Sequence, residues 1–211
     1  MYESLLFFIM KVWEWGSGHM KYAIESYHSI TMKELVHKKI SNESFLAQSV
    51  IIMTPRPVMT IHDHIPALEQ LFIDRNGVLP QNIIFLTVVQ HEKPYMFNAR
   101  YQITPFYKDH VKGQIMSVCM NFGSLEVPDV KKHLLGLAKH RLVSISDHPD
   151  TWLIHVLEEH FVPGKSLHPS TSFAVRLYES LEKNSESLAD YYGLGNISGL
   201  SSEFLPMKIH S

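Results

Sequence analysis

Histidines are the side chains of this sequence best suited to chemistry, because there are fourteen of them in 211 residues. An imidazole can bind a transition metal or transfer a proton near neutral pH. His62 and His64 flank Asp63 in a stretch that leads toward a predicted helix. A zinc site there would need a further protein ligand, and no neighbouring spacing supplies one. We therefore interpret the triplet as part of a loop and predict no metal site.

The remaining histidine groups also lack the geometry of a ligand set. His155 and His160 do not have the i, i+4 spacing of a zinc-protease helix. On a strand, their separation would point the two side chains to opposite faces, which favours a structural interpretation. His133 and His140 lie on the two flanks of a predicted helix, where they could tune a response to pH.

Glycines and the single cysteine give no catalytic motif either. Gly193, Gly195 and Gly199 follow a predicted helix and precede a predicted strand, whereas a dinucleotide fingerprint must follow a strand and open a helix. The sequence contains no Walker pattern and no Gly-x-Ser-x-Gly elbow. Cys119 stands among apolar neighbours, so we interpret it as a core thiol that forms no internal disulfide. We predict no catalytic residue, no cofactor and no enzymatic activity, and ligand-binding residues stay unknown.

Composition sets limits on fold and partners. With 45% hydrophobic and 19% charged residues, the chain is expected to form a globular domain with a real core and extra segments at its ends. The net charge of −2 shows no basic excess. Nucleic acid is therefore excluded as an expected partner.

The pattern of apolar residues predicts an α/β fold whose sheet is mixed, mostly parallel and covered by helices. The apolar runs at 50–53 and 83–89 are typical of buried strands. A helix predicted from Ile65 to Asp74 would connect these two strands as a right-handed crossover. Farther along, Pro128 and Asp129 open an amphipathic helix that begins near Val130. The other elements are strands at 50–53, 83–89, 142–145, 151–161 and 204–209, a hairpin of 101–107 with 114–120, and a long helix from Ser170 or Thr171 to Gly193.

The amino terminus is apolar over a short distance. Leu5 to Met10 reads LLFFIM and is followed by Trp13 and Trp15. A membrane span needs about 20 residues, so two interpretations stay open at this point. The segment is either an amphipathic or buried helix of a soluble protein, or the last turns of a membrane helix with the tryptophans at the interface. Short helices are predicted after it, at 20–27 and after the capping box of Thr31 and Glu34.

Several stretches together resemble the carboxy-terminal cytosolic domain of the KUP/HAK/KT potassium uptake transporters. The resemblance covers most of 49–210, and VWEWGSGHMKYAIE is similar to the stretch that leaves the last membrane helix of that family. It therefore favours the membrane-helix interpretation of LLFFIM. It implies the end of the last membrane helix and a helical linker over 1–48, followed by a cytosolic α/β domain over 49–211. The chain departs from the family in AQSVIIMTPRP, where a Val-Pro-Gly-Thr sequence is usual. The stretches that carry the resemblance are IIFLTVV, MNFGSLEVPDVKKHL, SFAVRLYESLEKNSESLADYYGL and FLPMKIH.

The resemblance implies a part of a proton-coupled potassium transporter at the cytoplasmic face of the inner membrane. The residues that bind potassium and protons would lie in membrane helices outside this chain, so no site residue is carried over. The chain would be a regulatory or structural portion, from a split gene or as a stand-alone remnant. Its implied partners are the membrane domain of the transporter, a second copy in a homodimer, and a nucleotide. The rival hypothesis is a stand-alone soluble α/β nucleotide-binding or small hydrolytic domain.

Overall fold

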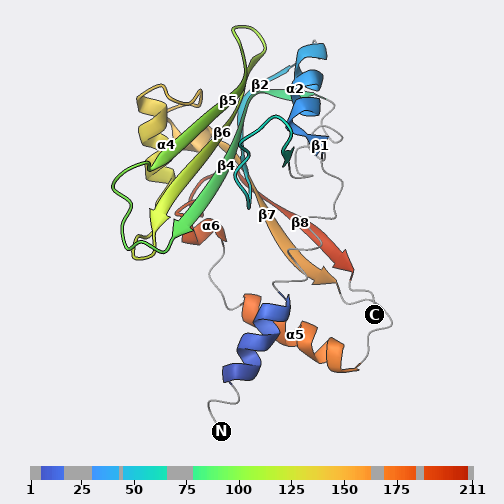
Figure 1. Cartoon of the computed structure of the whole chain (residues 1–211). Coiled ribbons are helices and arrows are strands. Elements are labelled where there is room, and N and C mark those ends of the chain that lie inside the picture. The colour runs from blue at the N-terminus through green and yellow to red at the C-terminus, as the bar shows by residue number, and fades with distance from the viewer. Residues whose placement is uncertain are drawn as a thin grey trace. The chain divides into compact units, whose positions relative to one another are not determined.

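The computed structural model describes the main chain of residues 6–16, 30–42, 45–65, 78–162, 169–183 and 188–208 (Figure 1). The chain divides into two compact units. One, here called the sheet unit, comprises His28–Val156 and Leu188–Ser202. The other, the helical unit, comprises Met1–Tyr27, Leu157–Ser187 and Glu203–Ser211. Each unit is described by itself.

A mixed sheet of six described strands organises the sheet unit. Strand β2 pairs in parallel with both β4 and β7, β4 pairs in parallel with β6, and β5 pairs with β6 in antiparallel orientation. The predicted α/β class with a mixed, mostly parallel sheet is therefore confirmed. The strand order is β5-β6-β4-β2-β7-β8, with bounds Tyr101–Asp109, Gly113–Gly123, Leu79–His91, Phe45–Met53, Leu153–Val162 and Leu200–Lys208.

The central strands are apolar on both sides because both faces of the sheet are buried. Side chains alternate along a strand, and Ile51, Ile84 and Met116 therefore point to one face while Ile52 and Phe85 point to the other. All five are at most 6% exposed. Continuous apolar runs such as IIFLTVV are typical of strands covered on both faces, which is how β4 lies here.

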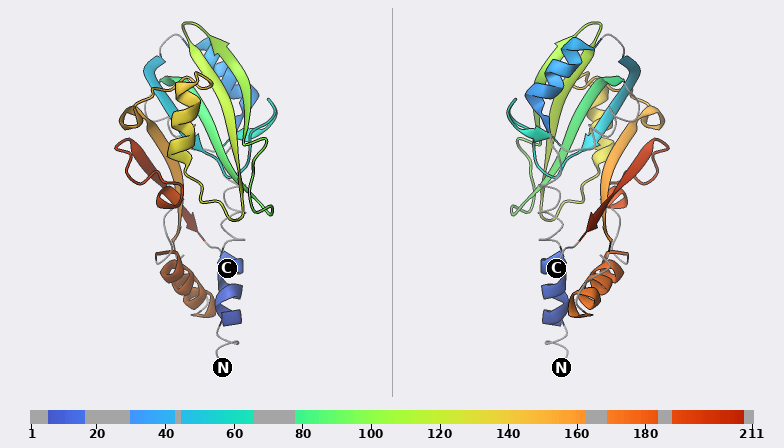
Figure 2. Two further views of the ribbon diagram at one scale, coloured as in Figure 1. Left: turned by 90° about the vertical axis from the view of Figure 1, so that its left-hand side faces the viewer. Right: turned by 90° about the vertical axis from the view of Figure 1, so that its right-hand side faces the viewer.

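A helix lies over part of each face. Helix α4 (Val130–Lys139) buries its apolar stripe against the face that carries Ile51, and the short α6 (Leu188–Tyr191) joins the same core through Ala189. The two views of Figure 2 place α2 (Met32–Ser41) on the opposite side of the sheet from α4. A small antiparallel pair, β1 (Ile30–Thr31) with β3 (His64–Ile65), precedes α2 and follows β2 in sequence.

A fully buried lysine joins α2 to the sheet. Lys39 donates hydrogen bonds to the main-chain carbonyls of Pro80 and Gln81, the latter at 3.0 Å, and its ammonium lies 4.3 Å from the centre of the Phe45 ring. Burial disfavours the charged form and lowers the pKa of Lys39 to about 8. The amine thus satisfies carbonyls at the start of β4.

The helical unit contains helix 6–16 and α5 (Pro169–Lys183), with the ends of β7 and β8. The rings of Trp13 and Tyr178 lie 5.2 Å apart, so the two helices pack against each other. Helix 6–16 buries Val12 but leaves Phe7 and Met10 62% exposed. Among the described helices, we find none with the length and hydrophobicity to cross a bilayer.

Two predicted elements are corrected or confirmed by local geometry. The strand predicted at 142–145 is wrong, because the segment forms bends in which Ser144 accepts a hydrogen bond from Ser49 and Ser146 accepts one from the Trp152 indole. The capping box is confirmed, since Thr31 accepts from the Glu34 amide and Glu34 accepts from the Thr31 amide.

Other predictions meet the limits of what is described. The hairpin of β5 with β6 and the last strand are confirmed. The helix predicted at 20–27, and 66–74 of the crossover helix, lie outside the described residues, while Ile65 belongs to β3. The long helix is described as α5 and α6, and 184–187 between them are not described.

Candidate functional site

The carboxyl ends of the parallel strands are the first place to look for a site. In the sheet, β2 has β4 on one side, and β7, which comes later in the chain, on the other. Open α/β sheets bind ligands outside the carboxyl ends of their strands, at the point where the strand order reverses. In this sheet that point lies beside β2.

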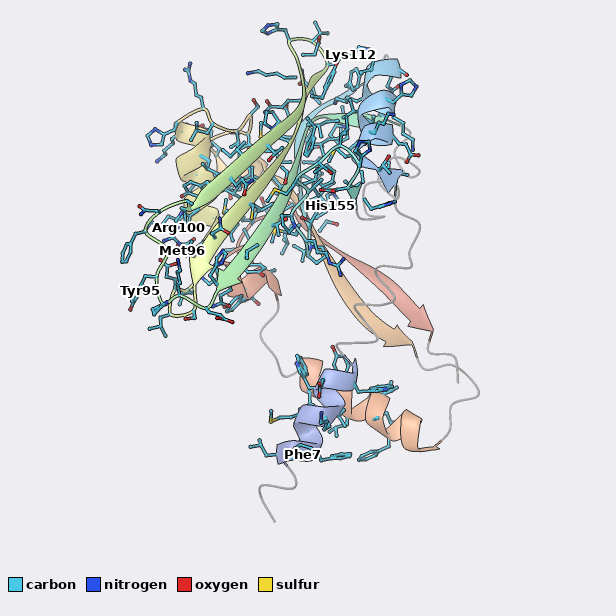
Figure 3. The ribbon with its side chains drawn as sticks, in the orientation of Figure 1. Phe7, Tyr95, Met96, Arg100, Lys112 and His155 are labelled. Atoms are coloured by element: carbon cyan, nitrogen blue, oxygen red, sulfur yellow. The ribbon has the colours of Figure 1, made fainter. Side chains whose placement is uncertain are left out.

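Two loops at this edge are joined by an ion pair between Arg100 and Glu126. The guanidinium donates through Nη1 to one carboxylate oxygen at 3.0 Å and through Nη2 to the other at 2.6 Å. It also donates to the carbonyl of Met96 at 2.6 Å and lies 5.0 Å from the centre of the Phe122 ring. Figure 3 shows Tyr95, Met96 and Arg100 together at this end of the sheet. We call this arrangement of 92–100 with 123–129 the clasp.

Glu126 is held ionised by the groups around it. The Arg100 guanidinium, together with the amides of Gly123 at 2.6 Å and Met96 at 3.2 Å, lowers the pKa of Glu126 to about 2. A carboxylate with so low a pKa cannot serve as a proton donor near neutrality. The residue therefore fixes the loops.

Asn121 bonds to both ends of the loop 92–100. Its side-chain carbonyl lies 2.8 Å from His91 Nε2, and its amide nitrogen donates to the carbonyl of Ala99 at 2.9 Å. Ala99 has a φ of 54°, in the left-handed region, and this bond holds it there. Cys119 lies on the same face of β6 and is buried, as predicted. Burial raises the pKa of its thiol, which keeps it protonated.

Buried hydroxyls lie close to the reversal point itself. The Thr54 and Thr87 hydroxyl oxygens are 2.6 Å apart, and Thr87 donates to the carbonyl of Arg56 at 3.1 Å. His155, at 8% exposure, lies in register with Ile52 on the adjacent strand, and Figure 3 places it near the middle of the sheet. These groups line the α2 side of the sheet. They can orient a polar ligand, and the hydroxyls are already bonded to the protein.

Asp63, which stands between His62 and His64, belongs to a local turn. The Asp63 carboxylate accepts from the Thr60 hydroxyl at 2.6 Å and from the Met59 amide at 2.7 Å, so it closes a turn. The Thr60 hydroxyl, together with the main-chain amides of Thr60 and Met59, lowers the pKa of Asp63. Within the part of the chain that is described, no three His, Cys, Asp or Glu side chains gather where a metal could be held.

His133 and the glycine run serve local structure. The His133 ring hydrogen-bonds the Tyr101 hydroxyl and lies edge-on to Phe122 at 5.2 Å, and burial with the nearby Arg100 lowers its pKa. His140 is exposed beyond the end of α4. Gly193 has a φ of 68° just after α6, a conformation that favours glycine. The prediction that none of these residues is catalytic or binds a metal stays a prediction.

Sequence analysis missed the ion pair that joins the two segments of the clasp. The partners Arg100 and Glu126 stand 26 positions apart on separate loops. Neither residue forms a spacing motif with a neighbour, so the loops come together only through the pairing of β6 with both β4 and β5. The stretch MNFGSLEVPDVKKHL, which contains Glu126, carries the family resemblance but no site prediction.

A second candidate is an apolar groove within the helical unit. It has a volume of about 780 Å³. Its wall consists mainly of apolar side chains of helix 6–16, and α5 contributes Leu181. Such a groove suits an apolar partner better than a polar ligand. The lining residues are Phe7, Ile9, Met10, Lys11, Trp13, Glu14 and Leu181.

Comparison with known proteins places this fold in a transporter family. No solved structure shows a significant match. The chain is 26% identical over 135 residues to a protein of Agrobacterium fabrum described as "Probable potassium transport system protein Kup 2". The matched region is 62% of this chain and 20% of that protein, so the chain spans about a fifth of the relative it matches. Residues 47–197 match the family described as "K+ potassium transporter C-terminal domain", and the chain therefore belongs to that family.

Proposed function

We propose that this chain is the cytosolic carboxy-terminal portion of a proton-coupled potassium uptake transporter. It acts as a regulatory or structural part at the cytoplasmic face of the inner membrane and conducts no ions by itself, since a pathway needs membrane-spanning elements. It has no enzymatic activity of its own. Its main partner is the membrane domain of the transporter, encoded by the other piece of a split gene.

The observation that carries the proposal is the family match over 47–197. The relative described as a potassium transport protein is about five times as long as the region that matches it. A sheet unit with its own core suits a carboxy-terminal domain attached to a larger protein. The membership also supports the division into the end of a membrane helix with a helical linker over 1–48 and a domain over 49–211.

Helix 6–16 supports a membrane-linked role. It leaves Leu6, Phe7 and Met10 each 62% exposed, on a helix that also carries Trp13 and Trp15. An apolar surface of this kind is costly in water and suits a lipid or another apolar helix. We propose that these side chains continue the last membrane helix and meet the bilayer or the membrane domain.

Complementation tests the proposal directly. The DNA upstream of Met1 is translated for a hydrophobic reading frame, and its product is produced with a tagged form of this chain in cells lacking their own potassium uptake. We expect growth at low potassium and rubidium uptake only when both parts are present. A protonophore should abolish that uptake if transport is coupled to protons.

The matched variants are Phe7→Ser and Val111→Ser, which remove exposed apolar side chains from helix 6–16 and from the β5–β6 turn. Phe7→Ser should weaken copurification with the membrane part, while Val111→Ser should leave it unchanged. Failure of the two parts to copurify or to restore uptake would exclude the proposed partnership.

A nucleotide ligand and a homodimer are finer proposals. The reversed strand order beside β2, with Thr54, Thr87 and His155 near it, is the feature of the sheet that favours a nucleotide. Adenine nucleotides or cyclic dinucleotides should then raise the melting temperature, and Thr87→Val should remove the shift. Light scattering after gel filtration tests the homodimer, and a monomeric mass at all concentrations would exclude it.

A further inference from the structure

His133, in the first turn of α4, joins this helix to two strands of the sheet. Its Nδ1 hydrogen-bonds the hydroxyl of Tyr101 on β5, and its ring lies edge-on to the ring of Phe122 on β6, with the ring centres 5.2 Å apart. Tyr101 and Phe122 lie on the face of the sheet against which α4 packs. We call the packing of the His133 ring on these two side chains the His133 contact. It holds the start of α4 on the β5–β6 hairpin.

The His133 contact is connected to the clasp through Phe122. The Arg100 guanidinium lies 5.0 Å from the centre of the same Phe122 ring and is paired with Glu126. One aromatic ring and one carboxylate thus already hold a cation at this place. Because an aromatic ring and a carboxylate both attract cations, a second positive charge on the His133 ring would compete with Arg100 for them. The charge state of His133 therefore bears on the clasp.

The charges that face the His133 ring are balanced in number but do not favour a proton on it. They are Arg100 before β5, Glu126 in the loop after β6, and Asp129 and Lys132 at the start of α4. Glu126 is already paired, and Asp129 caps α4 by accepting from the Lys132 amide at 3.0 Å. Burial of the ring, followed by the charge of Arg100, lowers the pKa of His133 below its ordinary value of 6.5.

A proton changes what the ring can bond. The neutral imidazole can accept the Tyr101 hydroxyl proton at Nδ1, whereas the protonated ring carries hydrogen on both nitrogens and can only donate. Burial raises the pKa of the Tyr101 phenol, so the hydroxyl keeps its own proton and must turn it away from the ring. A half-buried imidazolium is then left beside Arg100. Because the packed position disfavours the proton, binding of the proton disfavours the packed position to the same extent.

We propose that the His133 contact is a pH-sensitive switch: protonation of the ring by solvent separates the first turn of α4 from β5 and β6 and loosens the clasp. The separation begins as the pH falls below 6.5, because a released ring then binds protons that the packed ring does not. This range lies above that of Glu126, whose contribution is lost only between pH 4.5 and 2. The switch adds regulation to the sheet unit and needs no transporter partner.

A titration of the whole parent chain by nuclear magnetic resonance tests the switch. The imidazole C–H signals are followed from pH 7.5 to 4.0, together with the main-chain amides of Gly123 and Met96, which donate to Glu126. The His133 signal is the one that disappears in His133→Asn. We expect this ring to titrate with a midpoint below pH 6.5, and both amide signals to change with the same midpoint.

Matched variants in and just beyond α4 separate His133 from the other histidines. His133→Asn keeps a side-chain oxygen that can accept from Tyr101 but takes up no proton, while His140→Asn removes an exposed imidazole. Protection of the Gly123 amide from hydrogen exchange, corrected for the intrinsic rate at each pH, is compared at pH 7.5 and 5.5. In the parent chain it should fall several-fold, and by at most about ten-fold, the limit that linkage sets one pH unit below 6.5. His140→Asn should show the same fall, and His133→Asn should not.

Three results would overturn the proposal. The His133 ring could titrate at or above pH 6.5, the Gly123 and Met96 amides could stay unchanged while the ring titrates, or His133→Asn could keep the response of the parent chain. A change of these amides confined to pH values below 4.5 would belong to Glu126 and would equally exclude the switch. None of these measurements depends on potassium uptake, so failure here leaves the complementation test untouched.

Discussion

Two short apolar helices of this chain differ in what covers them. Helix α4 buries Val130, Leu134 and Leu137 to 2% exposure or less against the sheet. Helix 6–16 is at least as apolar in sequence, yet it buries only a narrow side, with Val12 at 6% exposure and Gly16 against Tyr178. The first helix completes a core, and the second presents apolar surface outward.

The difference shows that burial depends on the partner surface and not on the hydrophobicity of the helix alone. The sheet offers α4 a continuous apolar face made by four strands. Helix 6–16 meets α5 mainly through one aromatic pair and one glycine. Substitutions in the two helices should therefore change stability to very different extents. Three predictions test this, and a fourth tests the loop that leads into α4.

Leu134→Ala should have the largest effect. Leu134 is fully buried in the core, and replacing it leaves a cavity that costs about 3 kcal/mol of unfolding free energy. Urea unfolding followed by the fluorescence of buried Trp152 measures the loss. The control is Leu142→Ala, at a site 53% exposed beyond α4, which should cost much less. Equal losses would mean that α4 does not complete the core.

Gly16→Ala and Gly136→Ala should differ in sign. A Cβ on Gly16 would lie 2.2 Å from the Tyr178 ring, so we expect a cost of about 2 kcal/mol in the packing of helix 6–16 on α5. A Cβ on Gly136 in α4 would meet nothing within 4 Å, and alanine there should stabilise by up to about 1 kcal/mol. Hydrogen exchange in each helix measures both. Destabilisation by Gly136→Ala would contradict the comparison.

Acid should loosen the loop that leads into α4. The pKa of Glu126 in the folded chain is about 2, below its ordinary value of 4.5, so its stabilising contribution is complete above pH 4.5 and is lost as the pH falls toward 2. Stability of the sheet unit, measured by urea unfolding at stepped pH, should fall across this window. Glu126→Gln should be less stable at neutral pH and should show a smaller fall. An identical acid profile in the variant would refute the role of the clasp.

Met10→Ala should have the smallest effect on stability. Its side chain is 62% exposed, so truncation should change the unfolding free energy by less than about 0.5 kcal/mol. The same variant should nevertheless bind less detergent or lipid than the parent chain. A loss comparable to that of Leu134→Ala would show that this face of helix 6–16 is covered in the folded protein.

The elements predicted well are those whose signal is local. Alternating and continuous apolar runs indicated β4 and the β5–β6 hairpin, and Thr31 with Glu34 indicated the start of α2. The prediction of a strand at 142–145 was wrong because Val143 joins the core from an irregular turn, in which Arg141 has a φ of 56°. Its short apolar pattern is shared by a strand and by a buried loop.

The candidate site could hardly be predicted, since it depends on contacts between distant segments. Arg100 meets Glu126 only after β6 has paired with both β4 and β5. The exposure of Tyr95, Phe97 and Leu125 is likewise a property of the folded chain, and no sequence pattern indicated it. Lys39 gave the opposite surprise: a charged residue on an amphipathic helix lies fully buried.

Lys39 also gives the chain a chemical reporter of its own opening. Amine-reactive reagents modify the neutral amine, and a pKa near 8 makes that form abundant in mildly alkaline solution. Burial nevertheless shields the nitrogen, whereas its neighbours Lys33 and Lys38 are exposed. Acylation of Lys39 should therefore lag behind that of Lys33 and Lys38. The acylation rate of Lys39 then reports how often α2 separates from the start of β4.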